Sequence, residues 1–141
     1  CMKRLIILAT ALVCVLGLVG CSEKEPAIWD WTKELEREDI VSVTPWSEEN
    51  SFEALDDAAT LDLVVLLNNL TKENFTENKD LTGGTPAFGI RISLASETFN
   101  INQSIHPNGA LEIKYREKMW LIDNFELLDF VRTVTDTTPV E

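Results

Sequence analysis

The side chains that most often carry catalysis are scarce in this sequence. The only histidine, His106, stands directly before Pro107-Asn108-Gly109, a sequence typical of an exposed turn. Hydrolysis by a serine or cysteine nucleophile needs an imidazole base beside a presented nucleophile, and no Gly-x-Ser-x-Gly motif accompanies this histidine. A zinc site needs several histidine or cysteine ligands. We therefore expect His106 to be an exposed loop residue. We predict neither a serine or cysteine hydrolase site nor a zinc site.

Carboxylates, in contrast, are abundant, because the chain holds 24 Asp and Glu residues. Hard cations such as calcium bind carboxylate oxygens, and Glu48-Glu49-Asn50 and Asp56-Asp57 are the candidate ligands. The alternating Asp-x-Asp-x-Asp-Gly spacing of a calcium loop is missing, so we interpret both segments as solvated acidic loops. Paired carboxylates also serve as the acid and base of glycosidases. A small carboxylate-based hydrolase acting on cell-wall or secreted substrates therefore remains the alternative function.

Two other patterns indicate structure more than chemistry. The segment Thr82-Gly83-Gly84-Thr85-Pro86 is glycine-rich, but no Gly-Lys-Ser/Thr sequence follows it, so it predicts a turn and no phosphate site. The four tryptophans could form an aromatic platform for a sugar, but their apolar neighbours favour packing at the core or its boundary. They are Trp29, Trp31, Trp46 and Trp120. We predict no metal site, no cofactor and no enzymatic activity.

The first segment of the chain carries a different reactive residue. Lys3 and Arg4 precede an almost uninterrupted apolar run over residues 5–19, which is the pattern of an export signal. The run is shorter than the roughly 20 apolar residues of a spanning helix, and no basic flank follows it. At its end, Leu18-Val19-Gly20-Cys21 resembles the lipobox of bacterial lipoproteins, and the chain turns polar at Ser22. The alternative, a buried helix with an incidental cysteine, would need an apolar pocket that a small domain can hardly supply.

The lipobox resemblance implies a processing site and an address. A dedicated signal peptidase would remove residues 1–20 as a signal peptide, and Cys21 would carry acyl chains such as palmitate. Residues 21–25 would form a short lipidated tether. The expected location is the cell membrane, with the protein lipid-anchored on the extracytoplasmic face. We expect translation to begin at Met2, so Cys1 has no part in these predictions.

Cleavage changes both the thiol content and the charge. Cys14 leaves with the signal peptide, so Cys21 stays as the one cysteine, and disulfides and thiolate metal sites are excluded. Ten Lys and Arg residues then face 24 Asp and Glu residues, a net charge of −14. Such a field disfavours nucleic acid and repels anionic headgroups, so the acyl chains must supply membrane binding. The tether from Ser22 to Glu25 spans about 14 Å at most, which keeps the domain near the membrane.

The segments after the tether predict a single domain over residues 26–135, followed by a frayed tail at 136–141. Its first half predicts a helix over 26–37 and a strand over 39–44 that ends before Pro45. An acidic loop follows at 47–57. A helix over 58–70 is apolar on much of its circumference and is expected to be the most buried one. Residues 72–86 are expected to form a polar loop.

The second half changes to an alternation of apolar and polar residues, which predicts strands. Two strands are centred on Ile90 and Ile101, and the turn at residues 107–109 leads to a third around Ile113 and a fourth over 119–122. Asp123 and Glu126 predict the cap of a last helix. The apolar stripe of that helix is expected to contain Phe125, Leu128, Val131 and Val134.

The order of elements favours an α+β fold, with a four-stranded antiparallel meander plus one N-terminal strand and about three helices packed on one face. The other face of the sheet is expected to stay wet. Its predicted polar side chains are Arg91, Ser93, Asn100, Asn102, Ser104, Glu112 and Lys114. Such a face is usually solvated, but it offers a surface for a partner.

The order of elements also loosely resembles small uncharacterised lipoproteins of Gram-positive bacteria. That resemblance identifies no functional family, and no functional residue is carried over. We predict a non-catalytic envelope lipoprotein that binds a protein, peptide or cell-wall component through a sheet face or edge. An immunity protein against a toxin is a variant of this interpretation. A solute receptor for an importer is disfavoured, because such receptors resemble two-lobed proteins of more than twice this length.

Overall fold

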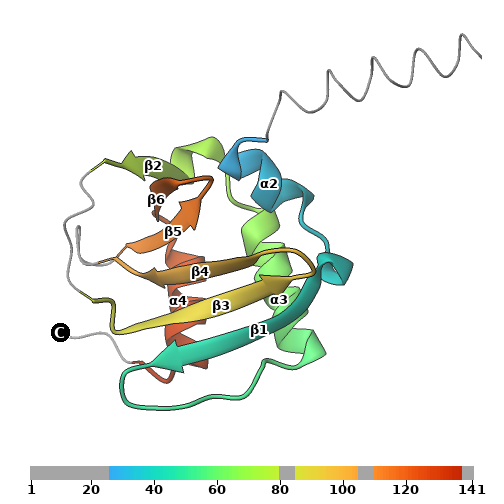
Figure 1. Cartoon of the computed structure of the whole chain (residues 1–141), viewed down its shortest axis with the longest axis vertical. Helices are drawn as coiled ribbons and strands as arrows, with labels where there is room; N and C mark the ends of the chain where they lie inside the picture. The colour runs from blue at the N-terminus through green and yellow to red at the C-terminus, as the bar shows by residue number, and fades with distance from the viewer. Residues whose placement is uncertain (1–25, 80–84, 105–109, 138–141) are drawn as a thin grey trace, which may run out of the picture.

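The computed structural model describes residues 26–79, 85–104 and 110–137. These residues form a six-stranded antiparallel sheet whose strands lie in the order β1-β3-β4-β5-β6-β2. Helices α3 and α4 lie behind the sheet, and α2 packs at one end of it (Figure 1). The strands are β1 Ile40–Ser47, β2 Phe75–Asn78, β3 Phe88–Leu94, β4 Thr98–Gln103, β5 Leu111–Tyr115 and β6 Lys118–Ile122. The helices are α2 Ile28–Glu34, α3 Asp57–Asn68, α4 Phe125–Val134 and the 3₁₀ turns η1 Arg37–Asp39 and η2 Lys72–Asn74.

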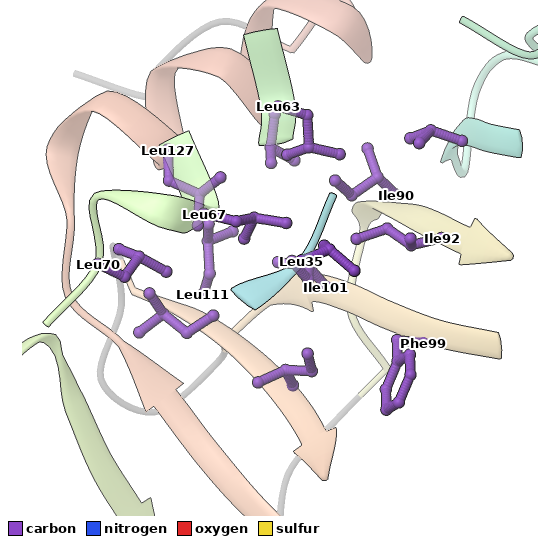
Figure 2. Packing of buried hydrophobic residues seen from close by; sticks show 14 of the residues in the cluster. Leu35, Leu63, Leu67, Leu70, Ile90, Ile92, Phe99, Ile101, Leu111 and Leu127 are labelled. Atoms are coloured by element: carbon purple, nitrogen blue, oxygen red, sulfur yellow. The ribbon is translucent and has the colours of Figure 1, made fainter. Parts of the chain in front are cut away.

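The hydrophobic core lies between the helices and the covered face of the sheet. Leu63 and Leu67 of α3 are fully buried, and so is Leu127 of α4. These leucines face Ile90 and Ile101 from the central strands (Figure 2). The predicted α+β class, with three helices beside an antiparallel sheet, is therefore confirmed. No helix in the described part of the chain is long and apolar enough to cross a membrane.

The predicted number of strands is wrong, because the sheet has six strands and not five. The additional strand, β2, lies within residues 72–86, which the sequence predicts to be a loop. It has four residues and pairs only with β6, where Phe75 stands opposite Ile122. Phe75 is its one buried residue. A segment with one buried residue shows no detectable alternation, which explains the missed strand.

Strand β1 is longer than predicted, because it continues through Pro45 to Ser47. Proline has no N–H to donate, but β1 is an edge strand that pairs only with β3, so its other side needs no donor there. The chain after β1 covers part of this free edge. Leu55 donates its backbone N–H to the Val43 carbonyl at 2.8 Å, and Ser51 forms a bridge with Trp46. The edge is thereby shielded from pairing with another chain.

Helix α2 is shorter than predicted, because it ends at Glu34 and not at Arg37. The side chain of Asn68 in α3 donates to the carbonyls of Thr32 at 2.8 Å and Leu35 at 3.0 Å. Asn68 thus satisfies carbonyls at the end of α2 that have no partner within the helix. This contact ends α2 and fixes it against α3.

The predicted start of the last helix also needs correction. Asn124, and not Asp123, is the cap of α4, and its side chain accepts the N–H of Leu127 at 2.8 Å. Phe125 does not join the buried stripe, because it is 79% exposed. Leu127 and Val131 are the buried residues of this helix.

Candidate functional site

The face of the sheet opposite the helices, here called the open face, is the candidate functional surface. It carries the side chains that alternate with the buried residues of β3, β4 and β5. Arg91, Asn100 and Lys114 are exposed there, as predicted. Asn102 and Glu112 are half-buried and stand opposite each other on β4 and β5. The predicted polar face is therefore real, although it is only partly solvated.

Ser104 is a correction to the predicted wet face, because its side chain is fully buried. Its hydroxyl hydrogen-bonds to the carboxyl of Glu112, and its backbone N–H donates to the carbonyl of Ala110 at 2.9 Å. Burial raises the pKa of Glu112, and the hydrogen bond from Ser104 partly opposes that rise. Ser104 therefore supports a buried polar contact beneath the open face.

A hollow opens where β4 and β5 separate. The two strands pair at three positions: Ile101 with Ile113, Asn102 with Glu112 and Gln103 with Leu111. The pairing stops at Ile101, so the part of β4 from Thr98 to Asn100 is not paired with β5. The cavity at this point measures about 480 Å³. That volume falls within the roughly 300–1,000 Å³ of small-ligand sites.

The lining of this hollow is polar and carries both signs of charge. From the β4 side it is lined by Glu97, Thr98, Phe99, Asn100 and Asn102, and from the β5 and β6 side by Glu112, Lys114, Arg116, Glu117 and Met119. Phe99 is buried, and its ring lies 4.5 Å from Trp31 of α2 and 6.2 Å from Tyr115. Amide, carboxyl and cationic groups can thus meet a ligand in the hollow, and Phe99 is the one aromatic residue among its lining residues.

Sequence reasoning missed several members of this lining. Glu97 and Thr98 lie at the start of β4, and Arg116 and Glu117 form the turn between β5 and β6. Arg116 and Glu117 both have positive φ, of 50° and 67°, which is a turn geometry that the sequence pattern does not specify. The apolar alternation reveals which residues face away from the core, but it does not reveal where two strands part.

Trp46 reaches across β3 on the open face. It stands opposite Gly89, and its indole N–H donates to the Asn102 side-chain oxygen on β4 at 3.2 Å. A Cβ at Gly89 would lie against that Asn102 oxygen and 2.6 Å from the Ile101 carbonyl. Only glycine lets the Asn102 amide lie this close to β3, because a contact of 2.6 Å forces atoms to shift. This bond holds one wall of the hollow to the edge strand.

The other three tryptophans lie on the covered face. Trp29 meets Trp120 edge-on at 5.8 Å, and Trp31 packs on Phe99 and Tyr115. All three pack against the core, which confirms the predicted boundary role for them. Trp46 differs, because it lies on the open face.

Both acids of the second segment considered for calcium have structural partners. Asp56 caps α3 by accepting the N–H of Ala59 at 2.8 Å, and Asp57 pairs with Arg37 at 2.9 Å. Glu48 donates its backbone N–H to the carbonyl of Ala87. Within residues 26–79, 85–104 and 110–137, no group of three or more His, Cys, Asp and Glu side chains is placed to hold a metal ion.

Several predicted features lie outside the described residues. They are the signal peptide 1–20, the tether 21–25 with the lipidation site Cys21, the glycine turn Gly83-Gly84, His106 with the turn at 107–109, and the tail beyond residue 137. The structure therefore neither supports nor opposes those predictions.

The fold is similar to that of one solved structure. A crystal structure of a candidate lipoprotein from Clostridium perfringens aligns with a TM-score of 0.55 and 22% sequence identity. The alignment covers 81% of this chain and 100% of that chain. No protein-family model and no curated protein matches the sequence. At this identity the likeness establishes a shared fold.

Proposed function

We propose that this protein is a bacterial lipoprotein, anchored through Cys21 on the extracytoplasmic face of the membrane. The sequence Leu18-Val19-Gly20-Cys21, at the end of an apolar run that follows Lys3 and Arg4, carries this proposal. The shared fold with a candidate lipoprotein of Clostridium perfringens supports it. In this role the domain is a non-catalytic binding module of the cell envelope.

The anchor is tested by replacing single cysteines in the full-length protein expressed in bacteria. Cys21→Ser removes the sulfur that receives the lipid, so labelled palmitate is not incorporated and the signal peptide is retained. Cys14→Ser is the matched control, because this cysteine lies inside the apolar run and should leave labelling unchanged. Palmitate labelling, detergent-phase partitioning and the mass of the mature chain are measured. Normal maturation of Cys21→Ser, with membrane retention in high salt, overturns the proposal.

Binding is assigned to the hollow between β4 and β5. Its volume of about 480 Å³ suits a short peptide segment or a sugar unit, and its amide groups supply neutral donors and acceptors. Asn100 and Asn102 line one side, and Lys114 lies on the other. The partner class is a protein, peptide or cell-wall component near the membrane, since the tether from Ser22 to Glu25 allows only about 14 Å of reach.

Crosslinking in the native cells tests this assignment. The lipidated protein is crosslinked, solubilised and purified, and the enriched partner is compared between variants. Lys114→Glu reverses a charge in the hollow and should reduce recovery of the partner at least about tenfold, as loss of a central charged contact does. Leu61→Ala is the control, because Leu61 is 48% exposed on α3, away from the open face. Equal recovery with both variants, or no enriched partner in repeated trials, contradicts the assignment.

A further inference from the structure

Strands β4 and β5 part before all the backbone groups between them are paired. In an antiparallel sheet, the residues of a strand direct their N–H and C=O groups alternately to one neighbouring strand and to the other. The N–H of Leu94 donates to the Glu97 carbonyl at 2.8 Å at the turn between β3 and β4. Counting along β4 from this bond, Phe99 and Ile101 bond to β3, and the backbone groups of Asn100 point toward β5.

The pairing of β4 with β5 has the same alternation. The N–H of Ser104 donates to the carbonyl of Ala110 at 2.9 Å. Two positions further along both strands, Asn102 and Glu112 are therefore a hydrogen-bonded pair. The backbone groups of every second residue on β4, counted from Ser104, thus face β5.

The next hydrogen-bonded pair in this register would be Asn100 with Lys114, and it is not formed. The ladder stops one position earlier, at Ile101 and Ile113. The N–H and carbonyl groups of Asn100 and Lys114 thus point into the gap from its two sides, where the hollow of about 480 Å³ opens. Figure 1 shows the two strands diverging toward α2 at this point. Strand edges with such backbone groups are templates for a further strand.

Aromatic rings occupy the covered side of the gap. Phe99 and Tyr115 would stand opposite each other if the register continued, and their ring centroids lie 6.2 Å apart. Trp31 of α2 packs on both rings, at 4.5 Å from Phe99 and 5.6 Å from Tyr115. These rings oppose closure of the two strands to the regular spacing of about 4.8 Å. The gap is therefore held open by packing, and it is accessible from the open face.

We propose that the hollow binds an extended peptide segment, which pairs through its backbone with Asn100 of β4 and Lys114 of β5. This inference rests on the proposed binding function of the hollow and names the class of ligand. Successive residues of an extended peptide direct their N–H and C=O groups to opposite sides. Two adjacent peptide residues can therefore bond to Asn100 and to Lys114 at once, as in the addition of a strand to a sheet. A sugar ring lacks this alternation of paired donors and acceptors.

The charges of the lining favour recognition of a backbone over recognition of a charged polymer. The ionisable residues of the lining are Glu97, Glu112, Lys114, Arg116 and Glu117. Neither sign dominates among them, so the hollow exerts little net attraction on a strongly anionic or a strongly cationic ligand. The uncharged backbone of a peptide needs no such attraction, because its hydrogen bonds supply the contacts.

The first test measures whether the gap is open in solution. It uses residues 21–141 with Cys21→Ser, which contain no thiol. Exchange of the backbone amide hydrogens is followed by NMR in the free protein. The amides of Asn100 and Lys114 should exchange at least about tenfold faster than the amide of Glu112, which lies in a bonded pair. Equal protection of the three amides would mean that the gap is closed, and the inference would be wrong.

The second test applies the same protein to an array of random pentapeptides, which are acetylated and amidated so that their ends carry no charge. Peptides that bind should slow the exchange of both the Asn100 and the Lys114 amide at least about tenfold. Copies of these peptides with every backbone nitrogen methylated keep the side chains but cannot donate, and they should lose binding. Absence of any binding peptide, or equal binding of the methylated copies, contradicts the inference.

Two variants at one position separate the backbone from the side chain. Asn100→Pro removes the N–H that points into the gap and breaks no bond to β3, because this N–H faces away from β3. Asn100→Ala removes the same side chain and keeps the N–H. The selected peptides should bind Asn100→Pro about fivefold more weakly than Asn100→Ala, which is the worth of one hydrogen bond. Equal binding to the two variants would refute the pairing.

A second pair of variants covers the case in which Asn100→Pro does not fold. Lys114→Pro and Lys114→Ala repeat the comparison from β5, with the same expected ratio and the same contrary result.

The failure of this inference can be distinguished from the failure of the proposed function. If an oligosaccharide of N-acetylglucosamine shifts the NMR signals of Asn100 and Lys114 and no peptide does, the inference is wrong and the hollow remains the binding site. If palmitate is not incorporated at Cys21, the proposed lipoprotein is wrong, whereas the peptide array does not depend on the anchor.

Discussion

The two faces of the sheet are formed by the same strands but have different roles. On β4, Ile101 is fully buried under the helices, whereas its neighbours Asn100 and Asn102 lie on the open face. The covered face is held by close apolar packing, and the open face by individual polar contacts such as that of Trp46 with Asn102. The covered face therefore supplies the free energy of folding, and the open face remains available for binding.

This division predicts that equal truncations on the two faces have unequal costs. The largest loss is expected from Ile101→Ala, because the side chain is fully buried on a central strand and its removal leaves a cavity. The free energy of unfolding should fall by about 3 kcal/mol. Urea unfolding followed by tryptophan fluorescence measures it.

The matched control for this prediction is Asn100→Ala, one residue away on the open face. Asn100 is exposed and accepts one long hydrogen bond from Arg91, at 3.5 Å. Its replacement should change the free energy of unfolding by less than about 0.5 kcal/mol. Similar losses for Ile101→Ala and Asn100→Ala would show that the open face also carries the fold.

The next largest effect is expected where the open face is packed as closely as a core. Gly89→Ala places a Cβ 2.6 Å from the Ile101 carbonyl, so the backbones of β3 and β4 must move apart. We expect a loss of about 2 kcal/mol, in the range of overpacked sites. Thermal unfolding measures it. Adding Asn102→Ala should restore only part of the loss, because the clash with the backbone carbonyl remains; full recovery would place the strain in the Asn102 side chain alone.

Strands that bury one face against the helices were predictable from the sequence. Alternation is imposed where one face is buried, as for Ile90 and Ile92 on β3 and for Leu111 and Ile113 on β5. Strand β2 has a single buried residue, Phe75, and so left no such signal. The fold class therefore follows from periodicity, whereas the number of strands does not.

The hollow was not predictable from the sequence, because its position depends on where the pairing of β4 with β5 stops. The polar inventory of β4 and β5 was visible in the sequence, but the separation of the strands beyond Ile101 is a property of register. The cap of α4 shows the same limit. The backbone N–H and carbonyl of Asp123 are both hydrogen-bonded to Asn74, and Asn124 caps the helix instead. Contacts between distant segments decide such details.

A smaller effect is expected from the polar contact that joins the edge strand to the hollow. Trp46→Phe removes the indole N–H that donates to Asn102 and keeps an aromatic residue opposite Gly89. The expected cost is about 1 kcal/mol, the typical worth of one hydrogen bond. Urea unfolding measures the cost, and NMR of the Asn102 side-chain amide reports whether the amide is released. An unchanged amide signal would mean that this bond does not position the wall of the hollow.

The smallest effect is expected from the half-buried carboxyl of the open face, and it depends on pH. Burial raises the pKa of Glu112, so the folded state binds this proton more tightly than the unfolded state. The resulting stabilisation is present below 4.5, the ordinary pKa of a glutamate, and is lost as the pH rises through the higher folded value. Glu112→Gln, which does not ionise, should therefore be more stable than the wild type at about pH 7 and equal to it near about pH 3. Because Glu112 is partly exposed and screened by solvent, the difference should be only a few tenths of a kcal/mol.

Ser104→Ala sharpens this last prediction. The hydroxyl of Ser104 hydrogen-bonds to Glu112 and lowers the pKa of that carboxyl, so its removal should raise the pKa further. The loss of stability should then extend to higher pH in Ser104→Ala than in the wild type, which urea unfolding from about pH 3 to about pH 8 would detect. If the difference between the wild type and Glu112→Gln is the same throughout that range, the carboxyl is fully solvated. The open face would then be a plain solvent surface, and its contrast with the covered face would be complete.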